Sequence, residues 1–568
     1  MQIRDKVRCC DLVMKGGVTS GVVYPGAIQQ IAREFNLVGI GGTSAGAIAA
    51  AVAAAAEYQR RQTGSMAGFE TLGEVSREMS DSQRLLDLFT PDASTSTHFK
   101  LAEPFLTGRS STWEQIKLAA KLLWQMWYKR KRERFLQPVI ANDFGVCSGM
   151  ANDNRGGNSP LTEWLSGLID RAAGASQQHH LTFRDLHNAK VPSGMKELLL
   201  YEKRSIDFRA VTTCLTFNRP FEFPVEDYAL AFDLEEWRRL FPASVISQLE
   251  KASESIVHDK FRAAGKLPLP TLDLPIIVAA RLSLSFPVLF SAVPVWAENH
   301  NKQGNPVERV LFSDGGITSN FPVHRFDAIY PRWPTLAINF KATDKHGRPL
   351  RKELLGKELP YTDQYVHMND NREDGIVEMW SSLDPEHRPQ KTFLSFIYSI
   401  FRSAQNWHDN AFLRLPGFRD RVAEVWLKPG QGGLNLNMDK AVVEELTTLG
   451  IQAGKVLTNR YTKLDADETM SWESHQWTRF RTGMEGLAES IKALRQSIGD
   501  DGVQGSDLGR HLSSTDAVCC FPFESDERRR DALRITNQIY DLALELEKTR
   551  AFNNGPRPQV DFGTRAPI

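Results

Sequence analysis

The chain has 568 residues, which exceeds one ordinary domain and predicts about two to four units or one large domain with insertions. Its 69 Lys and Arg residues balance 69 Asp and Glu residues, so no overall positive field would attract nucleic acid or an anionic membrane. With 41% hydrophobic and 24% charged residues, the composition is that of a globular protein and excludes global disorder.

The first apolar pattern along the chain alternates strands and helices. A strand over residues 7–14 precedes a glycine turn and a helix over 22–35. A short strand over 36–40 then precedes a second glycine turn and an alanine-rich helix over 45–58. Strands joined by helices indicate a parallel sheet. The predicted fold class is therefore α/β, with a mostly parallel central sheet flanked by helices.

The remaining sequence interrupts this pattern and then resumes it. Residues 60–200 and 343–390 are polar and lack sheet patterning, which predicts two insertions. We expect a unit over 1–462 that contains both insertions, and a helical C-terminal extension over 463–568 that ends in a disordered tail. The apolar pattern predicts strands over 207–217, 308–313, 335–342 and 422–427, and helices over 271–285, 391–406, 439–457 and 528–550.

Two apolar stretches resemble membrane spans. Residues 36–56 are uncharged over 21 positions, which meets the length of a transmembrane helix, but the glycines within them predict strand, turn and helix. Residues 282–297 contain Pro287 and Pro294, which predicts a buried helix end followed by a strand. We expect no transmembrane helix.

The cysteines and the N-terminus bear on the cellular compartment. The six cysteines form two adjacent pairs and two singles, without C-x-x-C or the spacing of a zinc site. The N-terminus is charged and has no apolar run of signal-peptide length. We expect a reduced, cytoplasmic protein, with membrane association or export by a route without a signal peptide as alternatives.

Residues Gly42-Thr43-Ser44-Ala45-Gly46 match the pattern G-x-S-x-G. A serine between a buried strand and an apolar helix lies on a tight elbow, where the flanking glycines remove Cβ clashes and expose the hydroxyl. The helix N-terminus beside it favours developing negative charge. Ser44 is therefore a candidate nucleophile. The alternative is an ordinary glycine turn in which Ser44 caps the helix.

A second glycine-rich segment, KGGVTSG, directly follows the first predicted strand and ends at Gly21. The ends of neighbouring parallel strands lie side by side, so N–H groups of Gly16, Gly17 and Val18 would point at a carbonyl oxygen held over Ser44. The competing interpretation is a dinucleotide-binding loop. Val18 at the third glycine position of that motif, and the absence of an acidic residue after the next strand, weaken it.

The third motif is Asp314-Gly315-Gly316, at the end of a predicted strand. A carboxylate in this position can reach a serine at a neighbouring strand end and accept its proton directly. Alone, D-G-G is most often a turn, but beside the other two motifs it indicates a catalytic carboxylate. A histidine base is the alternative, and its candidates are His187, His258, His324 and His367.

These motifs, in this order, resemble the patatin-like phospholipase family. The resemblance rests on KGGVTSGVVYPGAI, GGTSAGAIAA, ARLSLSFPVLF and LFSDGGITSNFPV, and spans about residues 8–460. It implies that Ser44 is the nucleophile and Asp314 the base of a Ser–Asp dyad. It also implies an oxyanion loop at Gly16, Gly17 and Val18, with motif glycines Gly21, Gly42, Gly46, Gly315 and Gly316.

Three positions depart from the family pattern. The family usually has Asp or a small residue where Lys15 stands, a third glycine where Val18 stands, and a basic residue where Ser20 stands. Val18 still has a backbone N–H to donate, so the loop keeps its donors. The missing basic side chain affects recognition of the substrate headgroup.

The resemblance implies a lipid acyl hydrolase of phospholipase A type, which cleaves carboxylic esters of membrane lipids through an acyl-enzyme. It implies no metal or organic cofactor, and we expect no nucleic-acid partner. Two other functions stay open: a nucleotide-binding module of Rossmann type, and a catalytically inactive scaffold of the same fold. Some members are held inactive until a cofactor or signal binds, so a protein or small-molecule activator also stays open.

The segment Trp113–Leu136 is a candidate for contact with a membrane surface. Its apolar residues recur at helical spacing, and seven Lys and Arg residues accompany its tryptophans. An equal alternative is a helix whose apolar stripe packs on the core while its basic end stays in solvent. The last hundred or so residues contain no motif that assigns them a role.

Overall fold

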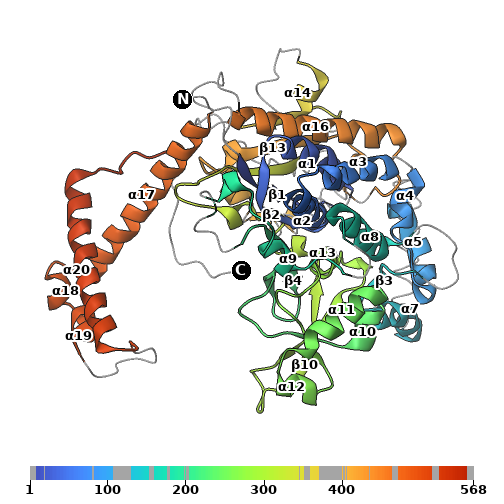
Figure 1. The fold of residues 1–568 in the computed structure, drawn as a ribbon, viewed down its shortest axis with the longest axis horizontal. Coiled ribbons are helices and arrows are strands. Elements are labelled where there is room, and N and C mark those ends of the chain that lie inside the picture. Colours follow the sequence, from blue (N-terminus) through green and yellow to red (C-terminus); the bar gives the residue numbers. More distant parts are fainter. Residues whose placement is uncertain are drawn as a thin grey trace.

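The structure is a computed structural model of the chain. It describes residues 8–17, 19–79, 82–106, 129–151, 159–175, 179–196, 199, 204–344, 346–350, 359–369, 399–400, 403, 406–407, 409–433, 435–462, 471–514 and 523–558. Within these residues, one 11-stranded sheet has the order β12-β13-β11-β1-β2-β4-β10-β9-β6-β7, and β5 pairs with β4 (Figure 1). A separate two-stranded sheet contains β3 and β8.

The centre of the large sheet is parallel. Its five strands are β13 (Val422–Leu427), β11 (Thr335–Ala342), β1 (Cys9–Met14), β2 (Asn36–Thr43) and β4 (Asp207–Cys214). Each pairs in parallel with its neighbour, and all are almost wholly buried. The predicted α/β fold with helices around a central sheet is confirmed, and its parallel pairing is confined to these five strands.

The outer strands pair antiparallel. They extend the sheet beyond β4 on one side and beyond β13 on the other. Their bounds, and those of the two-stranded sheet, are β5 Arg219–Phe223, β6 Ala231–Phe232, β7 Leu267–Pro268, β9 Val293–Glu298, β10 Val307–Ser313, β12 Val366–Met368, β3 Gly145–Cys147 and β8 Val288–Phe290.

The two faces of the sheet have separate cores, because successive strand side chains point to opposite sides. Leu12 and Met14 join the large core, to which α1 (Tyr24–Ala32), α2 (Ala45–Thr63) and the other helices of the body contribute. Val13 joins a smaller cluster on the opposite face. The alanines of α2 let it lie directly on β2 and β4.

Helices make up most of the predicted first insertion, and further helices lie between and after the strands of the second half of the chain. The insertion also contains the short strand β3, which the polar composition did not predict. The helix bounds are α3 Ala67–Met79, α4 Ser82–Asp87, α5 Ser96–Leu106, α7 Lys129–Ala141, α8 Leu161–Ala173, α9 Phe183–His187, α10 Leu234–Arg238, α11 Ala243–Glu254, α12 Asp259–Ala263, α13 Ile276–Ser283, α14 Tyr361–Tyr365 and α16 Lys440–Thr462.

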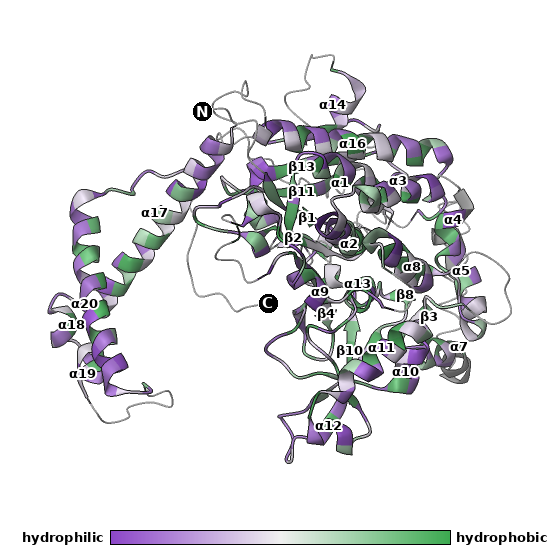
Figure 2. Ribbon diagram, viewed as in Figure 1, coloured by the Kyte–Doolittle hydropathy of each residue, from purple (hydrophilic) through white to green (hydrophobic). Residues whose placement is uncertain are grey.

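The C-terminal region is a helical arm that projects from the α/β body (Figure 1). It comprises α17 (Trp472–Ile498), α18 (Gly502–Gly505), α19 (Asp507–Ser513) and α20 (Asp526–Thr549). Hydrophobic and hydrophilic residues alternate along α17 and α20, and the arm has a small core of its own (Figure 2). The predicted helical C-terminal region is therefore present.

Ion pairs attach the start of α17 to the body. His475 Nδ1 lies 2.7 Å from Asp420 Oδ2, and Arg479 donates to Asp327 Oδ2 at 2.6 Å. His475, Asp420 and Arg479 are buried, and the side chain of Asp327 is 21% exposed. The arm is thus joined to the loop that follows the predicted D-G-G motif.

Several predicted boundaries differ from the structure. The helix expected over 22–35 divides into a 3-10 turn, Ser20–Val23, and α1. The strand expected to end at residue 40 continues to Thr43, directly before Ser44. Most of the helix expected over 391–406 lies outside the described residues. No helix in the described part of the chain is long and apolar enough to cross a membrane.

Glycine allows α1 and α16 to cross at close range. A Cβ added at Gly450 would lie 2.0 Å from the Val23 carbonyl oxygen. We predict that Gly450→Ala destabilises the protein by about 1–3 kcal/mol, because the backbones must separate. Gly167→Ala is the control, since its Cβ would meet only the Arg171 guanidinium at 3.5 Å.

Gly167→Ala should be neutral or stabilise by about 0.5–1 kcal/mol, the gain of helix propensity. Urea unfolding of the two variants measures both effects. Equal stability of the two variants would contradict the close crossing.

Candidate active site

Ser44 lies alone between the end of β2 and the start of α2. Its backbone has φ 55° and ψ −128°, a conformation that non-glycine residues rarely adopt and that is typical of strained functional sites. Its side chain makes no capping hydrogen bond to α2, so the alternative of a simple helix cap is wrong. The whole residue is only 4% exposed.

The two motif glycines beside Ser44 are required by packing. A Cβ at Gly42 would lie 2.2 Å from the Gly46 carbonyl oxygen, and a Cβ at Gly46 would lie 2.3 Å from the Met14 carbonyl oxygen. No side chain fits at either position without moving backbone. The predicted elbow is therefore present, and it is pressed against the end of β1.

A hydrogen bond from α13 holds the elbow. The Ser44 N–H donates to Ser283 Oγ at 2.9 Å, and this hydroxyl donates to the Val211 carbonyl at 2.5 Å. Ser283 is fully buried at the last residue of α13. This serine lies in the stretch ARLSLSFP, whose sequence pattern predicts no role for it.

Asp314 reaches Ser44 across β4, which lies between β2 and β10. Strand β10 overlaps β4 only at its last two residues, so its end lies near the end of β4. A Cβ at Gly315 would be 1.9 Å from the Val211 carbonyl oxygen and 2.9 Å from Thr43 Cγ2. Gly315 thus lets the turn pass directly over β4 towards the elbow.

The Asp314 carboxyl is buried and only partly satisfied. Its Oδ1 accepts the Gly316 N–H at 2.8 Å, and its own N–H donates to the Ser285 carbonyl at 3.0 Å. Burial raises its pKa to about 7, against the smaller lowering effects of the Ser44 hydroxyl and the Gly316 N–H. Among the described residues, Oδ2 has no partner at hydrogen-bond distance. The Ser44 contact is therefore loose, as is common at such sites without substrate.

The glycine loop after β1 lies against the elbow. A Cβ at Gly16 would be 3.2 Å from Ser44 Cβ, and a Cβ at Gly17 would be 2.2 Å from Ser20 Oγ. The Gly16 N–H donates to the Asn320 carbonyl at 2.9 Å, so in this conformation it is not available to an oxyanion. This corrects the expectation that the Gly16 N–H donates to the oxyanion. The Gly17 N–H has no partner among the described residues, and Val18 lies outside them.

An apolar cavity of about 100 Å³ begins beside the elbow. Gly21 and Ala45 line it next to Ser44, and Ala49 and Val52 continue the lining along α2. Trp164 of α8 and apolar residues of α3 and α4 complete the wall. Its volume is of the order of a cavity that holds benzene, about 150 Å³. The cavity suits a hydrocarbon chain better than a charged ligand.

The histidines proposed as alternative bases lie elsewhere. In the described part of the chain, none of His187, His258, His324 and His367 forms a hydrogen bond with Ser44 or Asp314. Burial lowers the pKa of His187 to about 4, and the His324 ring stacks on Phe412. The alternative of a histidine base for Ser44 therefore has no geometric support.

A different histidine forms a Ser–His–Asp arrangement that the sequence analysis missed. His180 Nε2 lies 2.8 Å from Ser244 Oγ, and His180 Nδ1 lies 3.0 Å from Asp170 Oδ2. Gln248 also exchanges hydrogen bonds with the His180 backbone in both directions. The trio joins α8 to α11.

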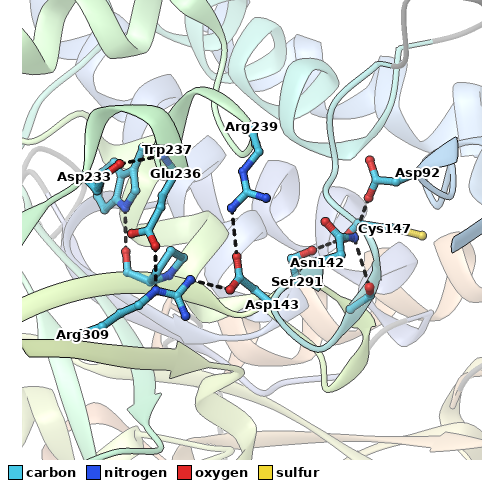
Figure 3. Close-up of polar contacts among 12 residues, drawn as sticks. Asp92, Asn142, Asp143, Cys147, Asp233, Glu236, Trp237, Arg239, Ser291 and Arg309 are labelled. Atoms are coloured by element: carbon cyan, nitrogen blue, oxygen red, sulfur yellow. Dashed lines mark hydrogen bonds and ion pairs between the residues drawn. The ribbon is translucent and has the colours of Figure 1, made fainter. Parts of the chain in front are cut away.

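Ion pairs fix β10 at the end opposite Asp314 (Figure 3). Arg309 of β10 pairs with Asp143, which precedes β3, and donates to Glu236 of α10 at 2.7 Å. Next to Asp143, Asn142 donates to Asp92 at 2.7 Å. The strand that presents Asp314 is therefore held by charged groups from the insertion as well as by its sheet neighbours.

The burial of Asp314 predicts a pH-dependent stability. Its pKa rises from 3.8 to about 7 on folding, so between these values the folded state binds more protons than the unfolded state. Its contribution to stability is therefore greatest at low pH and is lost as the pH rises through this window. A neutral amide does not carry this penalty.

We predict that the free energy of unfolding of Asp314→Asn, minus that of the unaltered protein, increases by about 3–4 kcal/mol when the pH is raised from 4 to 8. Urea unfolding of both proteins at the two pH values measures the difference. A stability difference that is the same at both pH values would contradict a buried, proton-binding carboxyl.

Comparisons with known proteins agree with the motifs. A family model described as patatin-like phospholipase matches residues 12–327, which is more than half of the chain. The protein called RpoH suppressor from Rhizobium meliloti (strain 1021) is 30% identical over an alignment 572 positions long, which covers 84% of this chain and 85% of that protein.

Among solved structures, VipD from Legionella pneumophila aligns over 97% of this chain and 88% of its own, with 12% identity and a TM-score of 0.27. The family assignment rests on the family model and on the relative from Rhizobium meliloti, and the elbow, the D-G-G turn and the glycine loop all lie inside the matched residues. The chain belongs to the patatin-like phospholipase family.

Proposed function

We propose that this protein hydrolyses carboxylic esters of membrane lipids, as a phospholipase A-type serine hydrolase. The observation that carries the proposal is the contact of the Ser44 hydroxyl with the buried Asp314 carboxyl, beside an apolar cavity. Membership of the family supports action on lipid esters.

The reaction has two steps. Asp314 accepts the Ser44 proton while Oγ attacks the ester carbonyl, and the alcohol then leaves the acyl-enzyme. The N–H groups of Gly17 and Val18, together with the positive end of α2, stabilise the oxyanion. Water then hydrolyses the acyl-enzyme. With the Asp314 pKa at about 7, the base is half ionised near neutral pH, so activity rises with pH through that value.

The two alternative functions have less support. A dinucleotide needs free loop N–H groups for its pyrophosphate, whereas the Gly16 N–H already bonds Asn320 and the adjoining cavity is apolar. An inactive scaffold would have no reason to keep Asp314 buried with an unpartnered oxygen at the cost of stability.

The wider arrangement of the chain is proposed as well. We place the catalytic unit within residues 1–462 and assign 463–568 to a helical C-terminal extension. Lipid contact through Trp113–Leu136 stays a proposal, because residues 107–128 lie outside the described residues. Within the described residues, no group of three or more His, Cys, Asp or Glu side chains is placed to hold a metal ion.

Covalent labelling tests the nucleophile. A fluorophosphonate probe should modify Ser44, as located by peptide mass spectrometry, and Ser44→Ala should abolish both labelling and ester hydrolysis. A folded protein that shows no adduct but binds a dinucleotide tightly would support the nucleotide-binding module. A folded protein with neither an adduct nor dinucleotide binding would support the inactive scaffold. An adduct on Ser244 would transfer the chemistry to the trio with His180 and Asp170.

Kinetics of variants test the base. Asp314→Asn should lower kcat by about 10³- to 10⁶-fold, because the hydroxyl loses its proton acceptor. Alanine variants of the four histidines first considered as bases, His187, His258, His324 and His367, are the controls and should retain activity. A folded histidine variant as inactive as Ser44→Ala would contradict the Ser–Asp dyad.

Filling the cavity tests its role as the acyl-chain site. Ala49 lines the cavity one helical turn beyond Ala45, so Ala49→Phe should occupy most of the space. We predict at least about a 10-fold loss of kcat/KM for long-chain esters, the effect of losing a few buried methylenes, with little change for acetate esters. Equal losses for both substrates would show that the chain binds elsewhere.

A further inference from the structure

A buried carboxylate outside the three motifs contacts the loop that follows Asp314. Asp409 is 2% exposed, and its Oδ2 accepts the Asn320 N–H at 3.0 Å. The Phe321 N–H acts on the same carboxyl. Asp409 lies beyond the residues matched by the family model, which end at 327, so the family assignment gives it no role.

Asn320 connects Asp409 to the glycine loop beside Ser44. Its carbonyl accepts the Gly16 N–H at 2.9 Å. Its side-chain Oδ1 lies 2.2 Å from the position of a Cβ at Gly16 and 2.9 Å from that of a Cβ at Gly316. Asn320 therefore lies between the glycine loop and the turn that carries Asp314, and its position sets the spacing of the two.

Apolar packing fixes Asp409 independently of these hydrogen bonds. Phe412, one helical turn beyond Asp409, is buried in the cluster that contains Phe321 and Val323. Its ring stacks on His324 with centroids 5.1 Å apart. The segment that carries Asp409 is thus anchored to the 320–324 loop by its own core.

Lys15 places a positive charge near this carboxylate. It directly precedes Gly16, its Nζ donates to Asn339 Oδ1 at 2.8 Å, and its charge lowers the pKa of Asp409. Burial acts in the opposite direction and is larger, so the pKa is raised to about 6. The carboxylate is thus ionised at the pH where Asp314 acts as a base.

We propose that Asp409 is a positioning residue, which holds Asn320 and through it keeps the Gly16–Gly17 backbone at the height of Ser44 Oγ. In this arrangement the Gly16 N–H is the attachment point of the loop, and Gly17 presents the donor to the oxyanion. The inference rests on the proposed hydrolase function for its effect on catalysis, but the attachment of the loop is independent of it.

Two variants of Asp409 separate its hydrogen bond from its charge. Asp409→Ala removes the acceptor, whereas Asp409→Asn keeps an oxygen that can accept the Asn320 N–H. Asp420→Asn is the control: it alters a similarly buried carboxylate, bonded to His475, at the opposite end of the parallel strands. Far-UV circular dichroism and urea unfolding establish that each variant is folded.

Hydrogen exchange followed by mass spectrometry measures the protection of the loop amides and does not require enzymatic activity. Peptides that cover residues 10–20 should exchange faster in Asp409→Ala than in the unaltered protein, because the Gly16 N–H loses its fixed acceptor. Asp409→Asn should restore most of the protection, and Asp420→Asn should leave it unchanged. Unchanged exchange in folded Asp409→Ala would overturn the proposal.

Hydrolysis of a short-chain ester gives the second readout. A displaced donor acts in the transition state, so Asp409→Ala should lower kcat by about 10- to 100-fold with little change in KM, and Asp409→Asn should recover much of the loss. A folded Asp409→Ala with kcat within about twofold of the original would overturn the proposal. If the unaltered protein does not hydrolyse the ester although its loop is protected from exchange, the hydrolase function is rejected. The exchange rates of the Asp409 variants then decide alone whether Asp409 holds the loop.

Discussion

The backbone at Ser44 is the constraint on which the site depends. A non-glycine residue with positive φ between a strand and a helix is strained, and it persists only where the surroundings permit no other conformation. Gly42 and Gly46 touch neighbouring backbone, and Ser283 accepts the Ser44 N–H. The elbow thus fixes how close β1, β2 and α13 lie to one another, and the glycine loop and the D-G-G turn are built around it.

The second constraint is a carboxyl in apolar surroundings. Burial of Asp314 disfavours its ionised form, and one N–H bond with a loose serine contact only partly compensates. The same burial that destabilises the fold makes the group a base near neutral pH, which an exposed aspartate is not. A well-satisfied carboxylate would be more stable and a weaker base, so the unpartnered Oδ2 is consistent with a functional group.

The sequence predicted what local pattern determines. The strands at 335–342 and 422–427 occur at the predicted residues, and Ser44, Asp314 and the two glycine segments lie together as expected. Local pattern does not encode which distant groups meet. Three features depend on contacts between residues at least 89 positions apart in the chain: the use of the Gly16 N–H by Asn320, the insertion of β4 between β2 and β10, and the buried Asp409.

The central sheet extends beyond the residues matched by the family model. That match ends at 327, yet β1, which leads into the glycine loop, pairs on one side with β11 at Thr335–Ala342, and β11 pairs with β13 at Val422–Leu427. A chain that ended at 327 would leave β1 as an edge strand, paired only with β2, and would also lack Asp409. The glycine loop is therefore held on one side by the motif strands and on the other by strands and a carboxylate from the following hundred residues.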